Sequence, residues 1–523
     1  MNNITPKIEL VLEKIGLESA TIKSIKPPWK RSQYHAVVNW LTEYKPHANT
    51  FNLEKVKGYL EAFYHLCQAE DWNRASKLIF IRLNTPTKEQ FHKQLYTWGY
   101  YQRQVEIYTQ ILSFSQLSLQ TKATVLTNLG KANIALVNFD QAIKYLKQSL
   151  TIAQEIKSPE EEEEARRNLG RAYLSKGNFA AGKDLVGNFD AAVKFDRAWN
   201  YFQQSLKISR KIKDSYREGR ALGEIGTFYG VSQKYDQAIC YYQKQLAIGK
   251  QIQNLSLEAR AKCNLGIVYC KLKDYEQAIK FSQSSLAIAR ELQDSQLETA
   301  NIGNLGFIER RLGNQTKAIE LSQKLLVTAK ETNNISIENL ALEDLAKIYY
   351  SQGDGEKATG NYDKAIEHYQ QSLSIVNKIQ SSQEETVLFL RDLILLNLGE
   401  IYRTNKDYVK AIDYLKNIFF AAEKNKSIEG VFLSVMSLAK VYAEQKNGRL
   451  SSSFYLGLAR FIIFAVFVKL ILKLMERIIV GFLYLADFVL DIFSPAISIV
   501  LIVFKLLRNI IPIKKHTKVN KNK

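Results

Sequence analysis

The sequence predicts an all-α fold, a solenoid built by repeating one pair of antiparallel helices. First, a Leu-Gly step or a close equivalent returns at intervals of 40, 56, 40, 40, 40, 53 and 40 residues, and a period of this size is typical of a solenoid. Second, apolar residues within each period recur at three- and four-residue steps, which is helical spacing. Third, none of the eight prolines lies between Pro159 and Pro495, so proline does not interrupt long helices there.

Before the repeats, residues 1–48 are basic and carry four of the eight prolines, and we expect a short helix or two with an extended linker. Apolar spacing over residues 49–115 predicts two divergent helix pairs, the first from Val56 to Leu83 and the second from Leu95 to Leu112. Because the end of a solenoid needs a cap, we expect these pairs to cover the first repeat.

The repeated step fixes how the two helices of a unit pack. It occurs at Leu129-Gly130, Leu169-Gly170, Ile225-Gly226, Leu265-Gly266, Leu305-Gly306, Leu345-Ala346, Leu398-Gly399 and Leu438-Ala439. A glycine inside a helix costs about 1 kcal/mol relative to alanine, so its return needs a packing reason. We expect Gly226 and Ala238 to let the two helices of their unit approach closely. Tyr229 and Tyr242 then fill the space beside them.

These residues carry a resemblance to a known family. The pattern Leu-Gly-x-x-Tyr, then Tyr-Asp-x-Ala-Ile-x-Tyr-Tyr, is similar to the tetratricopeptide repeat, and its forty-residue spacing resembles large cyanobacterial proteins of this family and Pins-type G-protein-signalling modulators. The resemblance implies a right-handed superhelix over residues 116–448, an array of about eight units with a concave peptide-binding groove. The family's proline after the second helix is absent here.

Two units carry insertions, near residues 180–195 and 353–361. Both contain local duplications: Gly177-Asn178-Phe179 recurs as Gly187-Asn188-Phe189, and a similar Gly-Asp/Asn segment recurs from Gly353 to Ala365. Because both fall at or near the turn inside a helix pair, we expect them to lengthen loops on one edge of the solenoid.

The resemblance also implies which positions face the groove. An asparagine stands just before the leucine of five units, and in relatives that bind peptides an asparagine at this position holds the ligand backbone: Asn128, Asn168, Asn264, Asn304 and Asn397. An amide offers both a donor and an acceptor, which suits an extended peptide. The alternative is a polar residue on an exposed helix face.

Basic residues recur beside these asparagines, and several map to groove-facing positions. They are Arg167, Arg171, Arg220, Arg260, Lys271, Arg310 and Arg311. Guanidinium groups bind carboxylates and phosphates in a bidentate manner, so an acidic peptide or a phosphopeptide is the expected ligand. A solvated charged face without a ligand remains the alternative.

After Asn447 the composition becomes strongly apolar. Residues 449–511 predict hydrophobic membrane-associated helices, as a hairpin across the bilayer or an anchor in its interface, with a buried helix on the last repeat as the alternative. The residues expected in lipid include Phe461, Phe464, Phe467, Leu470, Ile478, Phe482, Leu490, Ile497 and Phe504. The tail, residues 512–523, carries the lysines expected at anionic headgroups: Lys514, Lys515, Lys518, Lys521 and Lys523.

Charge and composition narrow the class of function. A formal net charge of +20 favours acidic partners, but the chain has no nucleic-acid-binding motif, so nucleic acid is not expected. The six histidines are scattered, the four cysteines form no C-x-x-C pair, and no phosphate-binding G-x-x-x-x-G-K-[ST] occurs. We therefore expect no catalytic site, no metal and no cofactor.

Together these features predict a non-enzymatic adaptor. Its repeat array would bind acidic or helical segments of a protein partner in the concave groove, while the C-terminus holds it at a membrane. The start of the chain lacks the apolar core of a signal peptide, so we expect the array in the cytoplasm. The alternatives are a regulatory protein that senses a ligand and an assembly factor for a membrane complex.

Overall fold

The computed structural model describes residues 4–18, 22–47, 50–114, 117–181, 189–380, 385–424 and 428–445. Over these residues it contains 22 α-helices, α1 and α3 to α23, and no β-strand. The chain divides into two compact units, Met1–Leu390 and Arg391–Lys523. The predicted all-α repeat fold is therefore confirmed.

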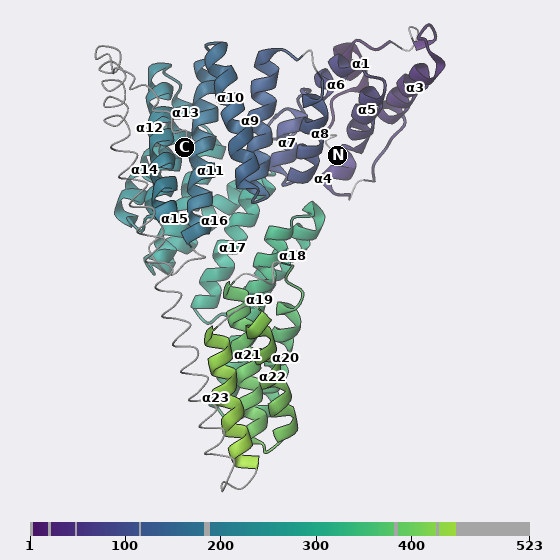
Figure 1. Cartoon of the computed structure of the whole chain (residues 1–523). Helices are drawn as coiled ribbons and strands as arrows, with labels where there is room; N and C mark the ends of the chain where they lie inside the picture. The colour runs from purple at the N-terminus through teal and green to yellow at the C-terminus, as the bar shows by residue number, and fades with distance from the viewer. Residues whose placement is uncertain are drawn as a thin grey trace, which may run out of the picture. The chain divides into compact units, whose positions relative to one another are not determined.

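Seven helices form an N-terminal block that precedes the repeats (Figure 1). They are α1 (Ile8–Ile15), α3 (Pro28–Thr42), α4 (Asn52–Lys55), α5 (Lys57–Gln68), α6 (Trp72–Ile79), α7 (Phe91–Thr97) and α8 (Tyr101–Leu112). Helix α3 packs on α5 and α1 packs on α6, so Val11 and Val37 lie in the same hydrophobic core as Phe63. The described part of residues 1–48 thus contains two helices, in agreement with the expected short helix or two, and the apolar faces of both helices are buried in the core of the block.

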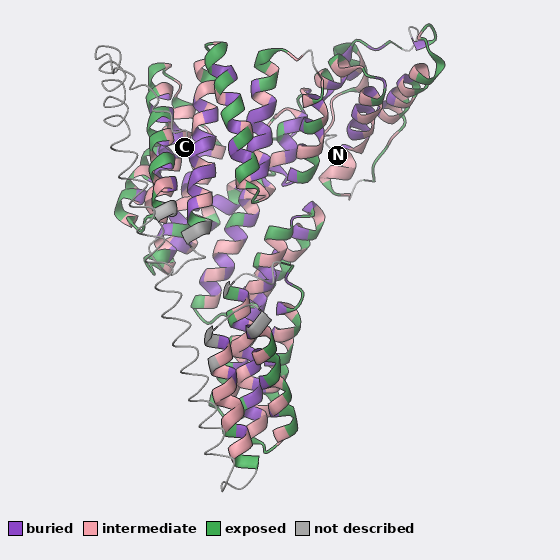
Figure 2. Ribbon diagram, viewed as in Figure 1, coloured by how far each residue is buried: buried purple, intermediate pink, exposed green. Residues whose placement is uncertain are grey.

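Six helix pairs follow within the same unit. They are α9 (Leu119–Ala135) with α10 (Phe139–Glu155), α11 (Pro159–Ala181) with α12 (Phe189–Lys211), α13 (Ser215–Val231) with α14 (Tyr235–Gln251), α15 (Leu255–Lys271) with α16 (Tyr275–Glu291), α17 (Ser295–Arg311) with α18 (Gln315–Thr332), and α19 (Ile335–Ala358) with α20 (Tyr362–Val376). Each helix packs against the next one in the chain. The buried residues follow the faces where neighbouring helices meet (Figure 2), as stacked repeats require.

The turns explain the forty-residue period. Helices α15 and α16 have 17 residues each, and a three-residue turn follows each of them. In the first turn Lys273 adopts a left-handed conformation with φ 64°, and the amide of Asp274 donates to the carbonyl of Tyr269, which ends α15. The Asp274 side chain then accepts from the amide of Gln277 and caps α16. One short segment therefore ends one helix and starts the next.

The recurring glycine lies where the two helices of a pair cross. A Cβ added at Gly226 would lie 2.7 Å from a ring carbon of Tyr242 on α14, and one added at Gly130 would lie 2.5 Å from Leu146 on α10. Both partners are buried. The packing reason predicted for the glycine of the Gly226 unit is therefore confirmed.

The second insertion lengthens a helix and not a loop, so the prediction for residues 353–361 is wrong. Helix α19 has 24 residues, whereas α17 has 17. Seven extra residues add about two helical turns, which keeps the same face of the helix inward. Gly353 then lies against the ring of buried Tyr369. Part of the first predicted insertion, residues 182–188, lies outside the described residues.

The second unit contains a stack of the same kind. Its described helices are the larger part of α21 (Glu385–Thr404), α22 (Tyr408–Lys424) and α23 (Ile428–Gln445). Tyr402 and Tyr414 stack with ring centroids 5.5 Å apart, and Gly399 lies against Leu415. Within the described part of the chain, no helix has the length and apolarity needed to cross a membrane. The predicted membrane helices over 449–511 and the tail over 512–523 lie outside the described residues.

Candidate functional site

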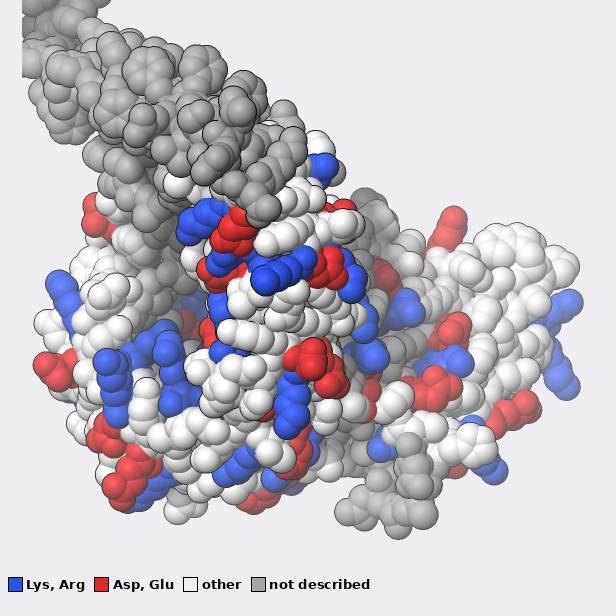
Figure 3. All heavy atoms as spheres, turned by 90° about the horizontal axis from the view of Figure 1, so that it is seen from below, with Lys and Arg blue, Asp and Glu red and all other residues white. Residues whose placement is uncertain are grey.

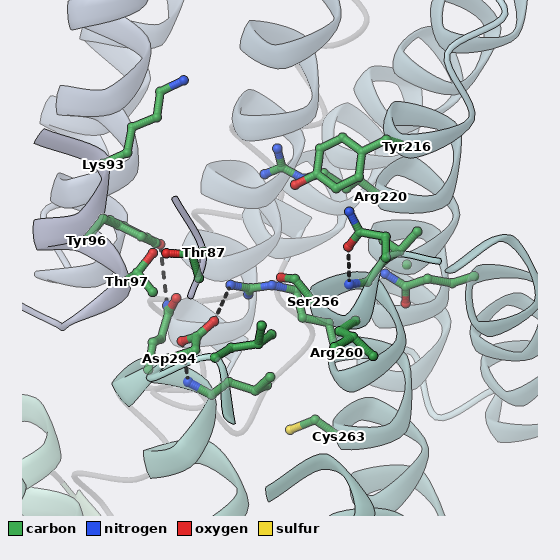
Figure 4. Close-up of a pocket in the computed structure, with 18 of the residues that line it drawn as sticks. Thr87, Lys93, Tyr96, Thr97, Tyr216, Arg220, Ser256, Arg260, Cys263 and Asp294 are labelled. Carbon is green, nitrogen blue, oxygen red and sulfur yellow. Dashed lines mark hydrogen bonds and ion pairs between the residues drawn. The ribbon is translucent and has the colours of Figure 1, made fainter. Parts of the chain in front are cut away.

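A cavity of about 900 Å³ lies inside the Met1–Leu390 unit. The first helices of five successive pairs, α9, α11, α13, α15 and α17, contribute to its wall. Helix α7 and the segment before it, from Arg82 to Gln90, line it as well (Figure 4). The N-terminal block is thus part of the site, whereas the sequence predicted only a cap.

A contact between α7 and α17 joins the N-terminal block to the repeat array beside the cavity. The amide Nε2 of Gln296 lies 3.5 Å from the hydroxyl oxygen of Tyr96, although the residues are 200 positions apart. The Nζ atom of Lys131 on α9 lies 5.1 Å from the centroid of the same tyrosine ring. Tyr96 therefore contacts the array at two helices. No local pattern in the sequence indicates this contact, because it depends on how far the array curves.

The charges that line the cavity are mainly positive. Seven basic side chains face it, namely Arg82, Lys93, Lys131, Arg171, Arg217, Arg220 and Arg260. Four acidic side chains accompany them, namely Glu89, Glu164, Glu224 and Asp294. On the face of the molecule seen in Figure 3, by contrast, basic and acidic side chains are interspersed. The cavity is therefore a site where anions are attracted.

A buried ion pair on α11 lies beneath the surface of the cavity. Arg167 and Glu163, both on α11, have fully buried side chains, and their Nε and Oε1 atoms are 3.1 Å apart. Arg217 on α13 approaches the other oxygen of Glu163 at 3.4 Å, and the hydroxyl of Ser205 donates to Oε1 at 2.8 Å. Two buried charges persist only with such partners. Arg167, predicted at the groove, is placed beneath its surface.

Lys131 and Glu164 face each other in the cavity, and both have strongly shifted pKa values. Burial lowers the pKa of Lys131 to about 8, because desolvation outweighs the attraction of Glu164. Burial alone would raise the pKa of Glu164, but the charges of Lys131, Arg220 and Arg167 hold it well below its usual range. Glu164 is therefore ionised at neutral pH. Lys131 is mostly protonated there and loses its charge as the pH rises through about 8.

The five predicted asparagines take different positions. Asn264 lines the cavity. Asn128 and Asn168 are buried, and their amides donate to the carbonyls of Thr124 and Glu164 in their own helices. Asn304 donates to the sulfur of Cys263 at 3.8 Å, and Asn397 belongs to the Arg391–Lys523 unit.

Asn128 and Asn168 each hold a basic side chain that faces the cavity. The Nζ atom of Lys131 donates to the Oδ1 of Asn128 at 3.2 Å. In the next repeat, Nη1 of Arg171 donates to the Oδ1 of Asn168 at 3.3 Å. Their observed role is thus to orient a cation three residues further along the helix.

The predicted basic residues also divide into groups. Arg171, Arg220 and Arg260 line the cavity. Three others, Lys271, Arg310 and Arg311, do not; they surround the ring of Phe307 at 6.0, 5.1 and 5.2 Å from its centroid. Arg310 also approaches Asp344 at 3.6 Å.

Several lining residues were not predicted. They are Lys93 and Tyr96 from α7, Lys131 from α9, Tyr216 from α13, and Gln245 from α14. Lys131 follows the Leu-Gly step of its repeat directly, so its register with Arg171 was visible in the sequence. The two α7 residues carry no repeat register and could not be found in this way.

Solved structures with a partial likeness to the chain include three of other proteins. One is a Rap protein complexed with competence and sporulation factor (14% identity, 71% of this chain and 99% of that one, TM-score 0.40). Another is a signal transduction ATPase with numerous domains and a tetratricopeptide repeat sensor from Pyrococcus horikoshii (15% identity, 91% and 75%, TM-score 0.43). The third is the apo quorum sensor NprR from B. thuringiensis (13% identity, 79% and 99%, TM-score 0.39).

Family models identify the repeats themselves. None of the curated proteins compared with the chain matches it. Models of the tetratricopeptide repeat match residues 123–156, 257–331 and 344–376. These ranges fall on α9 with α10, on α15 to α18, and on α19 with α20, each a run of antiparallel helices. The chain is therefore a tetratricopeptide repeat protein.

Proposed function

We propose that the chain is a non-enzymatic adaptor whose repeat array binds an acidic segment of a protein partner in the central cavity. The observation that carries the proposal is the excess of basic over acidic side chains lining this cavity. Lowered local dielectric strengthens charge pairs in such a site relative to bulk water. An acidic segment would place its carboxylates near Arg171, Arg220 and Arg260.

A buried amide in the wall supports a peptide as the ligand. Gln245 is 3% exposed, lines the cavity, and its Oε1 has no hydrogen-bond donor among the described residues. Leaving such an acceptor unpaired costs about 1–3 kcal/mol, and a backbone N–H of a ligand would satisfy it once the buried amide turns towards the cavity. A ligand that combines carboxylates with amide donors fits both observations.

The test uses a fluorescein-labelled peptide of alternating Glu and Ala. We expect the double variant Arg171→Gln, Arg220→Gln to bind it at least about tenfold more weakly than the native chain, because each charge-assisted bond contributes about 1.5–3 kcal/mol. Fluorescence anisotropy with the full chain in detergent measures the affinity.

The control removes two arginines from outside the cavity. Arg210 and Arg290 pair with Glu218 and Glu298, and their side chains are 58% and 56% exposed. The variant Arg210→Gln, Arg290→Gln carries the same net charge as the cavity variant and is expected to bind normally. Equal loss in both variants, or no loss in either, would mean that the cavity is not the binding site.

Proton loss from Lys131 predicts that peptide binding in the same assay depends on pH. The pKa of this side chain is lowered to about 8 by burial, so its positive charge disappears as pH rises through that value. We expect binding of the Glu-Ala peptide to weaken between pH 7 and pH 9, and Lys131→Gln to remove this step. A pH profile that Lys131→Gln leaves unchanged argues against a role for this ammonium group.

We also propose that residues 449–511 attach the chain to a membrane, with the array on the cytoplasmic side. The support is the apolar composition of this segment and the lysines after it. We expect the full chain in the membrane fraction of disrupted cells, resistant to alkaline carbonate, and a chain ending at Gln445 in the supernatant. Recovery of the full chain in the soluble fraction before carbonate is added would contradict membrane attachment, whereas release only by carbonate would contradict a hairpin across the bilayer.

A further inference from the structure

We propose that Lys131, Arg171 and Arg220 form a subsite that binds a phosphoryl group of the ligand. This inference rests on the proposed function, since it names the chemical group that the cavity selects. The three side chains come from α9, α11 and α13 and all line the cavity. Their side chains are 14%, 25% and 25% exposed, so they are withdrawn from bulk water but reachable from the cavity.

The cations of the subsite are only loosely paired with carboxylates. Lys131 and Arg220 lie 3.9 and 3.8 Å from the same Oε1 atom of Glu164, and Arg171 lies 3.4 Å from Glu224. The exposed pair of Arg210 with Glu218, by comparison, has a hydrogen bond of 2.8 Å. The N–H groups of the three cavity cations are therefore not saturated by the protein's own carboxylates.

The positive charge of the subsite exceeds its negative charge. Three cations share two carboxylates, and Nη2 of Arg167 approaches Glu164 as well, at 3.5 Å. Arg167 is fully buried, and its Nη1 has no acceptor among the described residues. This buried guanidinium therefore adds positive charge beneath the cavity wall that the nearby carboxylates do not fully pair.

The arrangement favours a phosphoryl group over a carboxylate. Lys131 and Arg220 reach towards Glu164 from α9 and α13, and Arg171 on α11 reaches towards Glu224, so donors from three helices face the same cavity. A phosphate monoester offers three acceptor oxygens with a charge of about −1.5 to −2 at neutral pH. A carboxylate offers two coplanar oxygens and a single charge. The buried amides of Asn128 and Asn168 hold Lys131 and Arg171 in place, which prepares the subsite before ligand arrives.

The experiment compares three fluorescein-labelled pentapeptides, Ala-Ala-X-Ala-Ala, with X as phosphoserine, Glu or Ser. Anisotropy titrations use the full chain in detergent at fixed ionic strength. We expect the phosphoserine peptide to bind about tenfold more tightly than the Glu peptide, and the Ser peptide to bind most weakly. Inorganic phosphate is expected to compete, whereas acetate at the same ionic strength is not.

Variants assign the preference to the subsite. Lys131→Gln and Arg220→Gln are expected to abolish the preference for phosphoserine over Glu, whereas the surface control Arg210→Gln keeps it. Melting curves by circular dichroism identify any variant that does not fold, and the comparison of peptides on the native chain does not depend on variants. Competition by inorganic phosphate without tight phosphoserine binding would mean that the phosphoryl group comes from a small free compound.

Equal affinity for the phosphoserine and Glu peptides, together with no competition by inorganic phosphate, overturns the inference. If the longer Glu-Ala peptide still binds in the cavity, the proposed adaptor function survives that result. Loss of binding by every peptide, with no effect of inorganic phosphate on the melting temperature, overturns both.

Discussion

Replacing Arg167 by methionine is expected to lower the free energy of unfolding by about 3–5 kcal/mol. Arg167 and Glu163 are both fully buried on α11, and the change leaves the carboxylate of Glu163 without its closest cation. Arg217 remains, but only at 3.4 Å from Oε2. Chemical denaturation of the chain ending at Gln445, followed by circular dichroism, measures the loss.

Two further variants show whether the cost comes from the uncompensated charge. Adding Glu163→Gln to Arg167→Met removes that charge, keeps an acceptor for the hydroxyl of Ser205, and is expected to recover most of the stability. Arg166→Met, next in the chain, breaks a pair with Glu162 in which both side chains are partly exposed, and is expected to cost about 0–1 kcal/mol. If Arg166→Met and Arg167→Met lower the free energy of unfolding equally, the buried pair contributes no more to stability than the partly exposed pair does.

Arg167 also shows where prediction from the sequence stops. Its position two residues before a leucine placed it at the groove, and neighbouring residues of that face do line the cavity. Whether a given long side chain lies on the wall or beneath it depends on the helices packed beside it. Here the guanidinium pairs inward with Glu163 on the same helix, and the hydroxyl of Ser205 on α12 donates to that carboxylate. Register in one helix cannot supply that information.

The repeats themselves could be predicted because each follows from local rules. Helix period, the glycine at the crossing and the polar turns all act within forty residues, and the pairs from α9 to α20 follow them. The contact of Tyr96 with Gln296 could not be predicted. It depends on the small rotation between each repeat and the next, added over several repeats. The seven residues added to α19 were misassigned because a duplicated Gly-rich segment resembles a loop, although its helix remains continuous through Gly353 and Gly355.

A substitution at the glycine of the repeated step is also expected to change the stability of the array strongly. We expect Gly226→Ala to destabilise the array, whereas Gly306→Ala, at the same place two repeats later, is expected to be neutral or stabilising. A Cβ at Gly226 would lie 2.7 and 2.8 Å from ring carbons of Tyr242, which is 4% exposed. At Gly306 the nearest atom, the Cβ of Leu321, is at 3.5 Å, an ordinary contact.

Both variants gain the same helix propensity, about 1 kcal/mol, so the difference between their unfolding free energies isolates the packing term. Overpacking of a core costs about 1–3 kcal/mol, and we expect a difference of this size between the two variants. Denaturation of both chains under identical conditions measures it. The two units differ in the residue sixteen positions after the glycine, which is Tyr242 in the unit of Gly226 and Ser322 in the unit of Gly306. Equal stability of the two variants would show that the helices of a pair can move apart at little cost, and close approach would then not explain why glycine recurs.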